Sequence, residues 1–122
     1  MAIYHVGELT KPFPHTSLLS PLTEDTVLFK LKPGVTPAQL AEWSAKAKGM
    51  VGQIPGLTKL EVNTPLASTA HRGQGFNMGL VAVLEKADDV KVYAEHPAHL
   101  EVHKFREELA DDTLAYDLEY SD

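Results

Sequence analysis

Four stretches of the chain have the pattern of β-strands. Three of them alternate apolar and polar residues, as a strand with one buried face does. The alternation is clearest between residues 26 and 32, where Val27, Phe29 and Leu31 occupy every second position. The third stretch is apolar at nearly every position, which predicts an interior strand covered on both faces. The four predicted strands are residues 26–32, 57–63, 76–84 and 113–120.

A helical pattern lies between the first two strands. Thr36 precedes Pro37, which is favoured in a first helical turn, and Gln39 is placed to complete a capping box with Thr36. Apolar residues then recur at three- and four-residue spacing, which places them on one stripe of a helix. The predicted helix ends at Pro55 and Gly56, and its stripe contains Leu40, Trp43, Ala47, Met50, Val51 and Ile54.

Two further helices are predicted between the third and fourth strands. Acidic residues at the start of segment 88–95 favour a short helix there, because the helix dipole stabilises negative charge in the first turn. Pro97 then opens a second helix that runs to about Leu109. Between the second and third strands, residues 64–75 carry Pro65 and two glycines among small polar residues, which predicts a loop.

The first 25 residues are less regular. Pro12, Pro14 and Pro21 interrupt any helix, and only residues 2–6 are dense enough in β-formers for a short strand. We therefore divide the chain into an N-terminal arm, residues 1–25, and one domain, residues 26–122. The arm is a candidate lid.

The order of these elements predicts an α+β fold. A four-stranded antiparallel sheet with helices on one face accounts for every predicted segment of the domain. The opposite face of the sheet also carries apolar residues and needs a cover. A second copy of the chain can supply that cover, so we expect a homodimer.

Composition narrows the functional classes. The chain has 122 residues, 43% of them hydrophobic, which suits one ordinary domain. A net charge of −6 disfavours binding to nucleic acid or an anionic membrane. The absence of cysteine excludes disulfides and thiolate catalysis. No signal peptide or membrane span is recognisable, so we expect a soluble, cytoplasmic protein.

One segment resembles a known family. Residues 92–99, which read Val-Tyr-Ala-Glu-His-Pro-Ala-His and lead through a helix into residues 112–120, are similar to the signature of the stress-responsive A/B barrel (Dabb) family, within the dimeric α+β barrel superfamily. Phe29-Lys-Leu-Lys32 before a helix and Ile54-Pro-Gly56 after it support the resemblance, which covers about residues 26–120. It implies a ferredoxin-like protomer, dimerisation into an α+β barrel, and a small-molecule pocket between sheet and helices.

The resemblance also implies candidate catalytic residues. In a plant polyketide cyclase of the family, which makes olivetolic acid, a histidine of the motif is the base for an aldol-type ring closure. His99 is the matching residue here, and a nearby tyrosine of that enzyme matches Tyr93. Two further histidines of the cyclase are replaced by Asp25 and Met78, which puts the same aldol activity in doubt. Asp25 is a candidate to orient or polarise His99 instead.

The chemistry of these side chains allows general acid–base catalysis. An imidazole such as His99 accepts protons at neutral pH, and the phenol of Tyr93 can donate a hydrogen bond to a substrate oxygen. The alternative is that both residues only stabilise the fold. The predicted substrate contacts are Trp43, Phe29, Asn77, Met78 and His96, although Trp43 also suits the core and His96 suits a helix cap.

A metal site is the weaker interpretation of the histidines. His99 and His103 are spaced to share one helical face, but no third ligand is placed by spacing, and His103 is expected on the solvated side. We therefore expect no metal and no cofactor. His5, His15, His71 and Arg72 lie in arm and loop segments, where solvated side chains are usual.

The leading hypothesis is a cofactor-independent enzyme that cyclises, dehydrates or isomerises a hydrophobic small molecule, with His99 as the acid or base and Tyr93 polarising an oxygen. Asp25 or Asn77 would assist. The alternatives are a non-catalytic stress-responsive or ligand-binding barrel and a cofactor-independent oxygenase.

Overall fold

The computed structural model describes residues 21–121. The predicted arm and its strand at residues 2–6 lie almost wholly outside this range. Between Leu22 and Tyr120 the chain forms four strands, three α-helices and one short 3-10 helix. In chain order the elements are β1 (Leu22–Leu31), α2 (Pro37–Lys48), β2 (Leu57–Asn63), η2 (Ala67–Gly73), β3 (Met78–Leu84), α3 (Asp89–Glu95), α4 (Pro97–Leu109) and β4 (Ala110–Tyr120).

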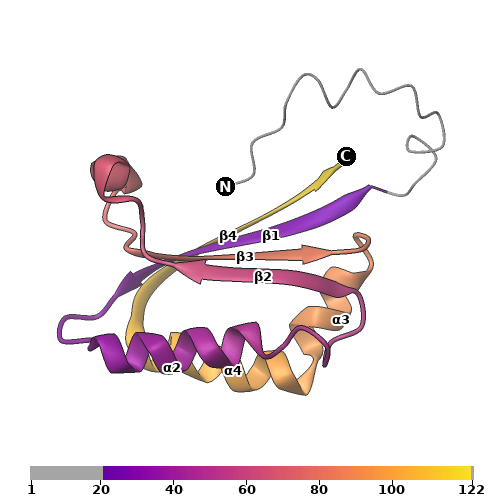
Figure 1. Cartoon of the computed structure of the whole chain (residues 1–122), viewed down its shortest axis with the longest axis horizontal. Helices are drawn as coiled ribbons and strands as arrows, with labels where there is room; N and C mark the ends of the chain where they lie inside the picture. The colour runs from indigo at the N-terminus through magenta and orange to yellow at the C-terminus, as the bar shows by residue number, and fades with distance from the viewer. Residues whose placement is uncertain (1–20, 122) are drawn as a thin grey trace.

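The four strands form one antiparallel sheet in the order β2-β3-β1-β4. Helices α2, α3 and α4 lie against one face of this sheet, and η2 projects on the other side (Figure 1). The face that meets the helices is called the inner face below, and the opposite one the outer face. The α+β, ferredoxin-like fold expected from the sequence is confirmed, and β3 is an interior strand as predicted.

The start of α2 is fixed by its own sequence. The Thr36 Oγ1 accepts a hydrogen bond from the Gln39 backbone N–H at 3.2 Å, and the Gln39 Oε1 accepts one from the Thr36 N–H at 2.8 Å. This reciprocal pair satisfies two backbone donors at the helix N-terminus. The predicted capping box is therefore confirmed.

The predicted end of this helix is wrong. The helix stops at Lys48, and a series of turns carries the chain to β2. Gly52 adopts a φ of 94°, a left-handed conformation that glycine reaches at little cost. Met50 and Ile54 are buried through these turns, whereas Val51 is 40% exposed. Apolar spacing alone did not distinguish the turns from further helix.

Strand β1 begins at Leu22, four residues before the predicted start. Residues 22–25 therefore belong to the sheet and not to the arm. Asp25 pairs in register with Ala82 of β3 and with Asp117 of β4. Backbone pairing on both sides extends the strand through polar residues that have little β-propensity of their own.

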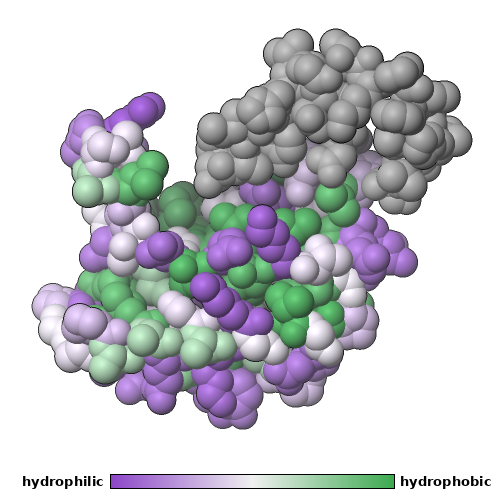
Figure 2. Space-filling model, in the orientation of Figure 1, coloured by the Kyte–Doolittle hydropathy of each residue, from purple (hydrophilic) through white to green (hydrophobic). Residues whose placement is uncertain are grey.

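The core fills the space between the inner face and the helices. Trp43 of α2 is 1% exposed and packs edge-to-face on Phe29 of β1, with ring centroids 4.8 Å apart. Phe105 of α4 stacks on the same indole at 6.4 Å. In Figure 2, hydrophobic residues are visible in the middle of the molecule, where the sheet lies, and hydrophilic residues predominate along the edge of the helices that points away from the sheet. No helix within residues 21–121 combines the length and apolar character needed to cross a bilayer.

The part of the outer face formed by β4 and β3 carries exposed and half-buried apolar side chains. Leu114, Tyr116 and Leu118 of β4 are 51%, 64% and 41% exposed. Val81 and Val83 of β3 lie on the same face. Each is joined across β1 to a residue of β4, Val81 to Tyr116 and Val83 to Leu118, and the two valines are half-buried. The expectation that both faces of β3 are covered thus holds fully for the inner face and only partly for the outer face.

Candidate active site

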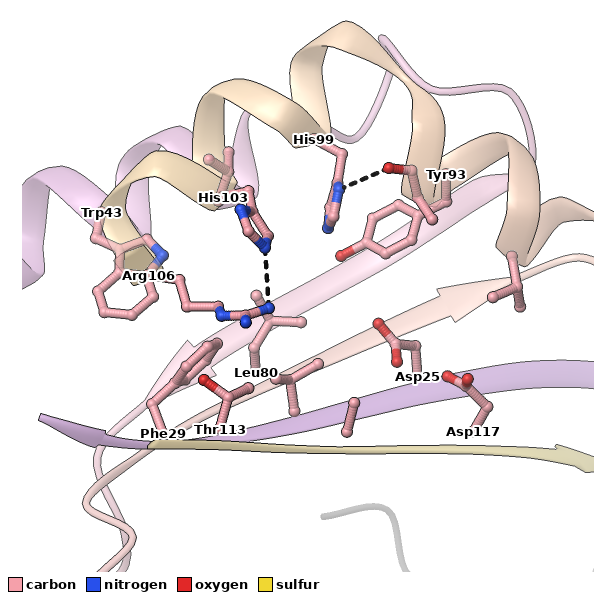
Figure 3. A pocket seen from close by; sticks show the side chains of 15 residues that line it. Asp25, Phe29, Trp43, Leu80, Tyr93, His99, His103, Arg106, Thr113 and Asp117 are labelled. Atoms are coloured by element: carbon pink, nitrogen blue, oxygen red, sulfur yellow. Dashed lines mark hydrogen bonds between the residues drawn. The ribbon is translucent and has the colours of Figure 1, made fainter. Parts of the chain in front are cut away.

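A cavity of about 210 Å³ lies between the inner face and helices α2, α3 and α4. Its lining is mostly apolar, and its polar groups come from β1, β4, α3 and α4 (Figure 3). Five of the residues predicted as catalytic or substrate-binding line it: Asp25, Phe29, Trp43, Tyr93 and His99. Strand alternation and the short α3–α4 bend bring them together from distant parts of the sequence.

His99 lies in the first turn of α4, just after the break at Pro97. Its Nδ1 is 3.1 Å from the carbonyl oxygen of Ala94. Because a carbonyl only accepts hydrogen bonds, Nδ1 carries the proton, and Nε2 keeps a lone pair. Burial lowers the pKa of His99, and the positive charge of Arg106 acts in the same direction. The imidazole is therefore a neutral base at neutral pH.

Tyr93 is buried beside this imidazole. It comes from the last turn of α3, is 4% exposed, and its ring centroid lies 4.5 Å from that of His99. Both side chains extend from the helices toward the sheet (Figure 3). Burial raises the pKa of Tyr93, and the negative charges of Asp25 and Asp117 raise it further. The phenol stays protonated and can donate a hydrogen bond into the cavity.

Two carboxyl groups face the cavity from the sheet. Asp25 and Asp117 are opposite one another on β1 and β4, and both point to the inner face. Burial raises the pKa of Asp25 to about 8, and its hydrogen bond to Asp117 and the charge of Asp117 add to the rise. Two adjacent carboxyls hold one proton because they resist ionising together. The suggestion that Asp25 orients His99 is not supported. The partner of Asp25 is Asp117, and the partner of His99 is the carbonyl of Ala94.

His103 and Arg106 line the cavity one and two turns beyond His99 on α4, respectively. The Arg106 Nη1 donates to the His103 Nε2 at 2.9 Å, and the His103 Nδ1 lies 3.3 Å from the Glu107 Oε1. The sequence placed His103 on the solvated side; its side chain is 33% exposed but also lines the cavity, so that prediction holds only in part. Within residues 21–121, no group of three or more His, Asp or Glu side chains is arranged to hold a metal ion.

The family model of the stress responsive A/B barrel domain matches residues 24–120. The chain belongs to this family. A dimeric ferredoxin-like protein of unknown function from Bacteroides fragilis is 26% identical, with a TM-score of 0.63 over 81% of this chain and 96% of that one. No curated protein matches the sequence.

Two other solved structures share the fold at lower identity. A Dabb family protein from Mesorhizobium loti is 19% identical, with a TM-score of 0.64 over 81% of this chain and 96% of that one. A hydroxynitrile lyase from Passiflora edulis is 16% identical, with a TM-score of 0.70 over 83% of this chain and 94% of that one. Solved structures with this fold therefore include a dimeric protein, a Dabb family protein and an enzyme.

Three predicted substrate contacts of this A/B barrel domain do not line the cavity. The Asn77 Oδ1 accepts a hydrogen bond from the Leu31 N–H at 2.8 Å, which ties β3 to β1. The His96 Nδ1 accepts one from the Ala98 N–H at 3.0 Å, so His96 is the helix cap that was its alternative interpretation. Met78 is buried and lines a second cavity beside α2 and β2.

Two polar residues of the cavity, Asp117 and Arg106, were not predicted from the sequence. Asp117 alternates with Leu114, Tyr116 and Leu118 on β4, so apolar alternation alone would have turned it away from the core, whereas it lines the cavity. Its pairing with Asp25 depends on the β1–β4 register, which the sequence does not specify. Arg106 is spaced to share a helical face with His99 and His103, and that signal was present.

Proposed function

We propose that this A/B barrel protein is a cofactor-independent enzyme that transfers protons on a hydrophobic small molecule, in a cyclisation, dehydration or isomerisation. The observation that carries the proposal is one cavity that brings together the imidazole of His99, the buried phenol of Tyr93 and the buried carboxyl of Asp25, with burial lowering the pKa of His99 and raising that of Asp25. Separate acid and base groups with displaced pKa values are typical of sites that catalyse proton transfer.

The size and lining of the cavity limit the substrate. A dry cavity of about 150 Å³ is known to accommodate benzene, so about 210 Å³ leaves room for one ring with small substituents. Phe29, Trp43 and Leu80 supply apolar contact. A substrate with a single ring, or a short chain of similar volume, and a carbonyl or hydroxyl group fits this space.

The geometry supports a division of roles. The Nε2 of His99 takes a proton from the carbon next to a substrate carbonyl. The electrons of that C–H bond form a carbon–carbon double bond, and the π electrons of the C=O bond move onto the oxygen. The carboxyl of Asp25 donates its proton to that oxygen, which forms a neutral enol. The hydroxyl of Tyr93 donates a hydrogen bond to the same oxygen and stabilises charge that develops there.

The hydroxynitrile lyase of Passiflora edulis adds limited support. Its likeness shows that this fold accommodates a lyase, whereas the specific reaction proposed for this chain rests on the chain's own cavity residues. Cyclisation, dehydration and isomerisation each begin or end with proton transfer at an oxygen or a carbon. The same three side chains can perform that step in all of them.

We further propose that the protein is a homodimer joined through its outer face. Apolar residues on β4 and β3 leave a patch of this face open, and solved relatives from Bacteroides fragilis and Thermobifida fusca are dimeric. Burying three large side chains such as Leu114, Tyr116 and Leu118 stabilises association through the hydrophobic effect. The cavity lies on the inner face, so dimerisation leaves its lining in place.

Hydrogen exchange at a ketone tests the proposed chemistry without knowledge of the natural substrate. The full chain is incubated with acetophenone in heavy water, and NMR follows deuterium entering the methyl group. We expect the wild type to accelerate exchange and His99→Ala to reduce that rate by about 100-fold or more, the usual range for loss of a general base. Tyr93→Phe should slow exchange less, because it removes one hydrogen bond.

His71→Ala is the matched control, because His71 is an exposed histidine of η2 that does not line the cavity. It should exchange at the wild-type rate. No exchange above buffer in the wild type, or equal rates in wild type and His99→Ala, would contradict the proposal. Binding of acetophenone without any exchange would instead favour a non-catalytic ligand-binding barrel.

A further inference from the structure

The cavity has chemically different ends. Along β1 and β4 the inner-face pairs run from Asp25 and Asp117, through Val27 and Ala115, to Phe29 and Thr113. The first pair is acidic, the second apolar, and the third carries a hydroxyl beside an aromatic ring. Because each strand residue advances about 3.3 Å, the distance from Asp117 to Thr113 along β4 is about 13 Å.

Helix α4, which lies over the sheet, also places different groups at the two ends of the cavity. His99 lies toward the carboxyl pair, and Arg106 lies toward Phe29 and Thr113 (Figure 3). Seven residues of helix separate them, a rise of about 10 Å. A ligand that lies along the cavity therefore meets the acid–base groups at one end and a guanidinium at the other.

The guanidinium of Arg106 lacks an acidic partner within the described residues. Its side-chain contact is with the Nε2 of His103, which accepts its hydrogen bond, while the carboxylates of Glu107 and Glu101 lie beside His103 and Lys104 instead. Arginine presents five N–H donors in a planar fork that matches a carboxylate. Most of these donors are free to face an anion in the cavity.

Burial decides which end of a ligand carries charge. Arg106 is exposed, so an anion that pairs with it keeps part of its hydration. Asp25 and Tyr93 are 7% and 4% exposed, and an anion beside them would be desolvated and would face Asp117. Burying an unpaired charge costs far more than burying a neutral, hydrogen-bonded oxygen. The acid–base end therefore accepts an uncharged group.

We propose that the natural ligand is a small monocarboxylate whose carboxylate binds Arg106, whose apolar middle lies over Val27 and Ala115, and whose neutral carbonyl or hydroxyl reaches Asp25, Tyr93 and His99. An aromatic acid with the oxygen-bearing group opposite the carboxylate has this shape. The inference rests on the proposed function only for the reacting end; the assignment of the carboxylate end stands on Arg106 and Thr113.

Binding of para-acetylbenzoate and of its neutral analogue para-acetylbenzamide tests the inference. Amide chemical shifts of the full chain give Kd for each probe. We expect the acid to bind more tightly than the amide. Arg106→Gln should weaken binding of the acid by about 10-fold or more, the usual effect of losing a hydrogen bond to a charged group, and should leave the amide within about two-fold.

Arg72→Gln is the control, because Arg72 lies on η2 outside the cavity and the change in charge is the same. It should leave both Kd values unchanged. Equal Kd values for the acid in wild type and Arg106→Gln, equal Kd values for acid and amide, or no binding of the acid at millimolar concentration would each overturn the inference.

The same probes separate this inference from the proposed function. Arg106-dependent binding of para-acetylbenzoate with no deuterium exchange at its methyl group would preserve the carboxylate site and defeat the enzyme proposal. Exchange that depends on His99, with a Kd and a rate that Arg106→Gln leaves unchanged, would preserve the enzyme proposal and defeat the carboxylate site.

Discussion

The two faces of the sheet are built from alternate side chains of the same strands, and they differ in what covers them. On the inner face, Phe29 and Leu80 are 4% exposed beneath the helices. On the outer face, Tyr116 and Leu118 remain 64% and 41% exposed. Both faces carry apolar side chains, so their presence alone does not separate the face of the cavity from the face proposed for dimerisation.

Buried polar groups make the distinction. Thr23 and Asp25 are 2% and 7% exposed on the inner face, and the Oγ1 of Thr23 has no hydrogen-bond partner among the described residues. Such groups reduce stability relative to apolar residues of the same shape. On the outer face of the same strand, Glu24 and Thr26 contact each other and are only half-buried. Polar burial at a cost in stability therefore marks the functional face.

The largest effect on stability is expected from removing the indole that packs against the inner face. Trp43→Ala removes the indole that packs on Phe29 and Phe105, and a buried Trp→Ala change costs about 3–5 kcal/mol. Chemical denaturation of the variant should show this loss in the free energy of unfolding. Trp43→Phe retains an aromatic ring and should lose less. A loss below about 1 kcal/mol for Trp43→Ala would show that the inner face is not the principal core.

A charge on the outer face should affect association and leave folding largely intact. Tyr116→Asp places a carboxylate where the second subunit is proposed to pack, and a buried unpaired charge should raise the dimer Kd by about 100-fold or more. Sedimentation velocity should then show monomers at concentrations where the wild type is dimeric. Ala45→Asp adds the same charge on the exposed surface of α2 and should remain dimeric. Dimeric Tyr116→Asp would require a different interface.

The smallest effect is expected from Asp25→Asn at acid pH, because the carboxyl is then protonated in both the folded and the unfolded state and resembles the uncharged amide. The difference appears with pH. Asp25 has a pKa of about 8 in the folded chain against 3.8 unfolded, so the folded state holds a proton that the unfolded state releases between these values. The free energy of unfolding of the wild type should therefore fall as pH rises from about 4 to about 8.

In Asp25→Asn this fall should be largely absent. Urea denaturation of both proteins at several pH values measures it, and Glu24→Gln on the outer face is the matched control, which should keep the wild-type pH dependence. Parallel curves for the wild type and Asp25→Asn would show that Asp25 ionises normally.

Local sequence patterns predicted much of the fold, because alternation and capping depend on neighbouring residues. The capping box at Thr36 and the half-buried strand β2 follow directly from such patterns. The end of α2 could not be predicted in this way, because Met50 and Ile54 have helical spacing but lie in turns that bury them. The early start of β1 was also missed, because pairing with β3 and β4 overrides the weak β-propensity of Glu24 and Asp25.

The candidate site was predicted in part. The family resemblance pointed to Tyr93 and His99, and the structure places both beside Asp25 in one cavity. The partners of these groups could not be read from the sequence. Asp25 meets Asp117 through strand register, and His99 is oriented by the carbonyl of Ala94 through the bend before α4. Both relations depend on three-dimensional placement that residue spacing does not report.

The most direct test of the central claim, that the inner face holds a protonated acid at neutral pH, is an NMR titration of the Asp25 side chain. The carboxyl carbon is assigned by comparing carbon-13 spectra of the wild type and Asp25→Asn, and its shift is followed from acid to alkaline pH. A midpoint near 8 is predicted, because burial and Asp117 oppose ionisation. A midpoint near the ordinary value of 3.8 would contradict the account, since the cavity would then contain two carboxylates and no carboxylic acid.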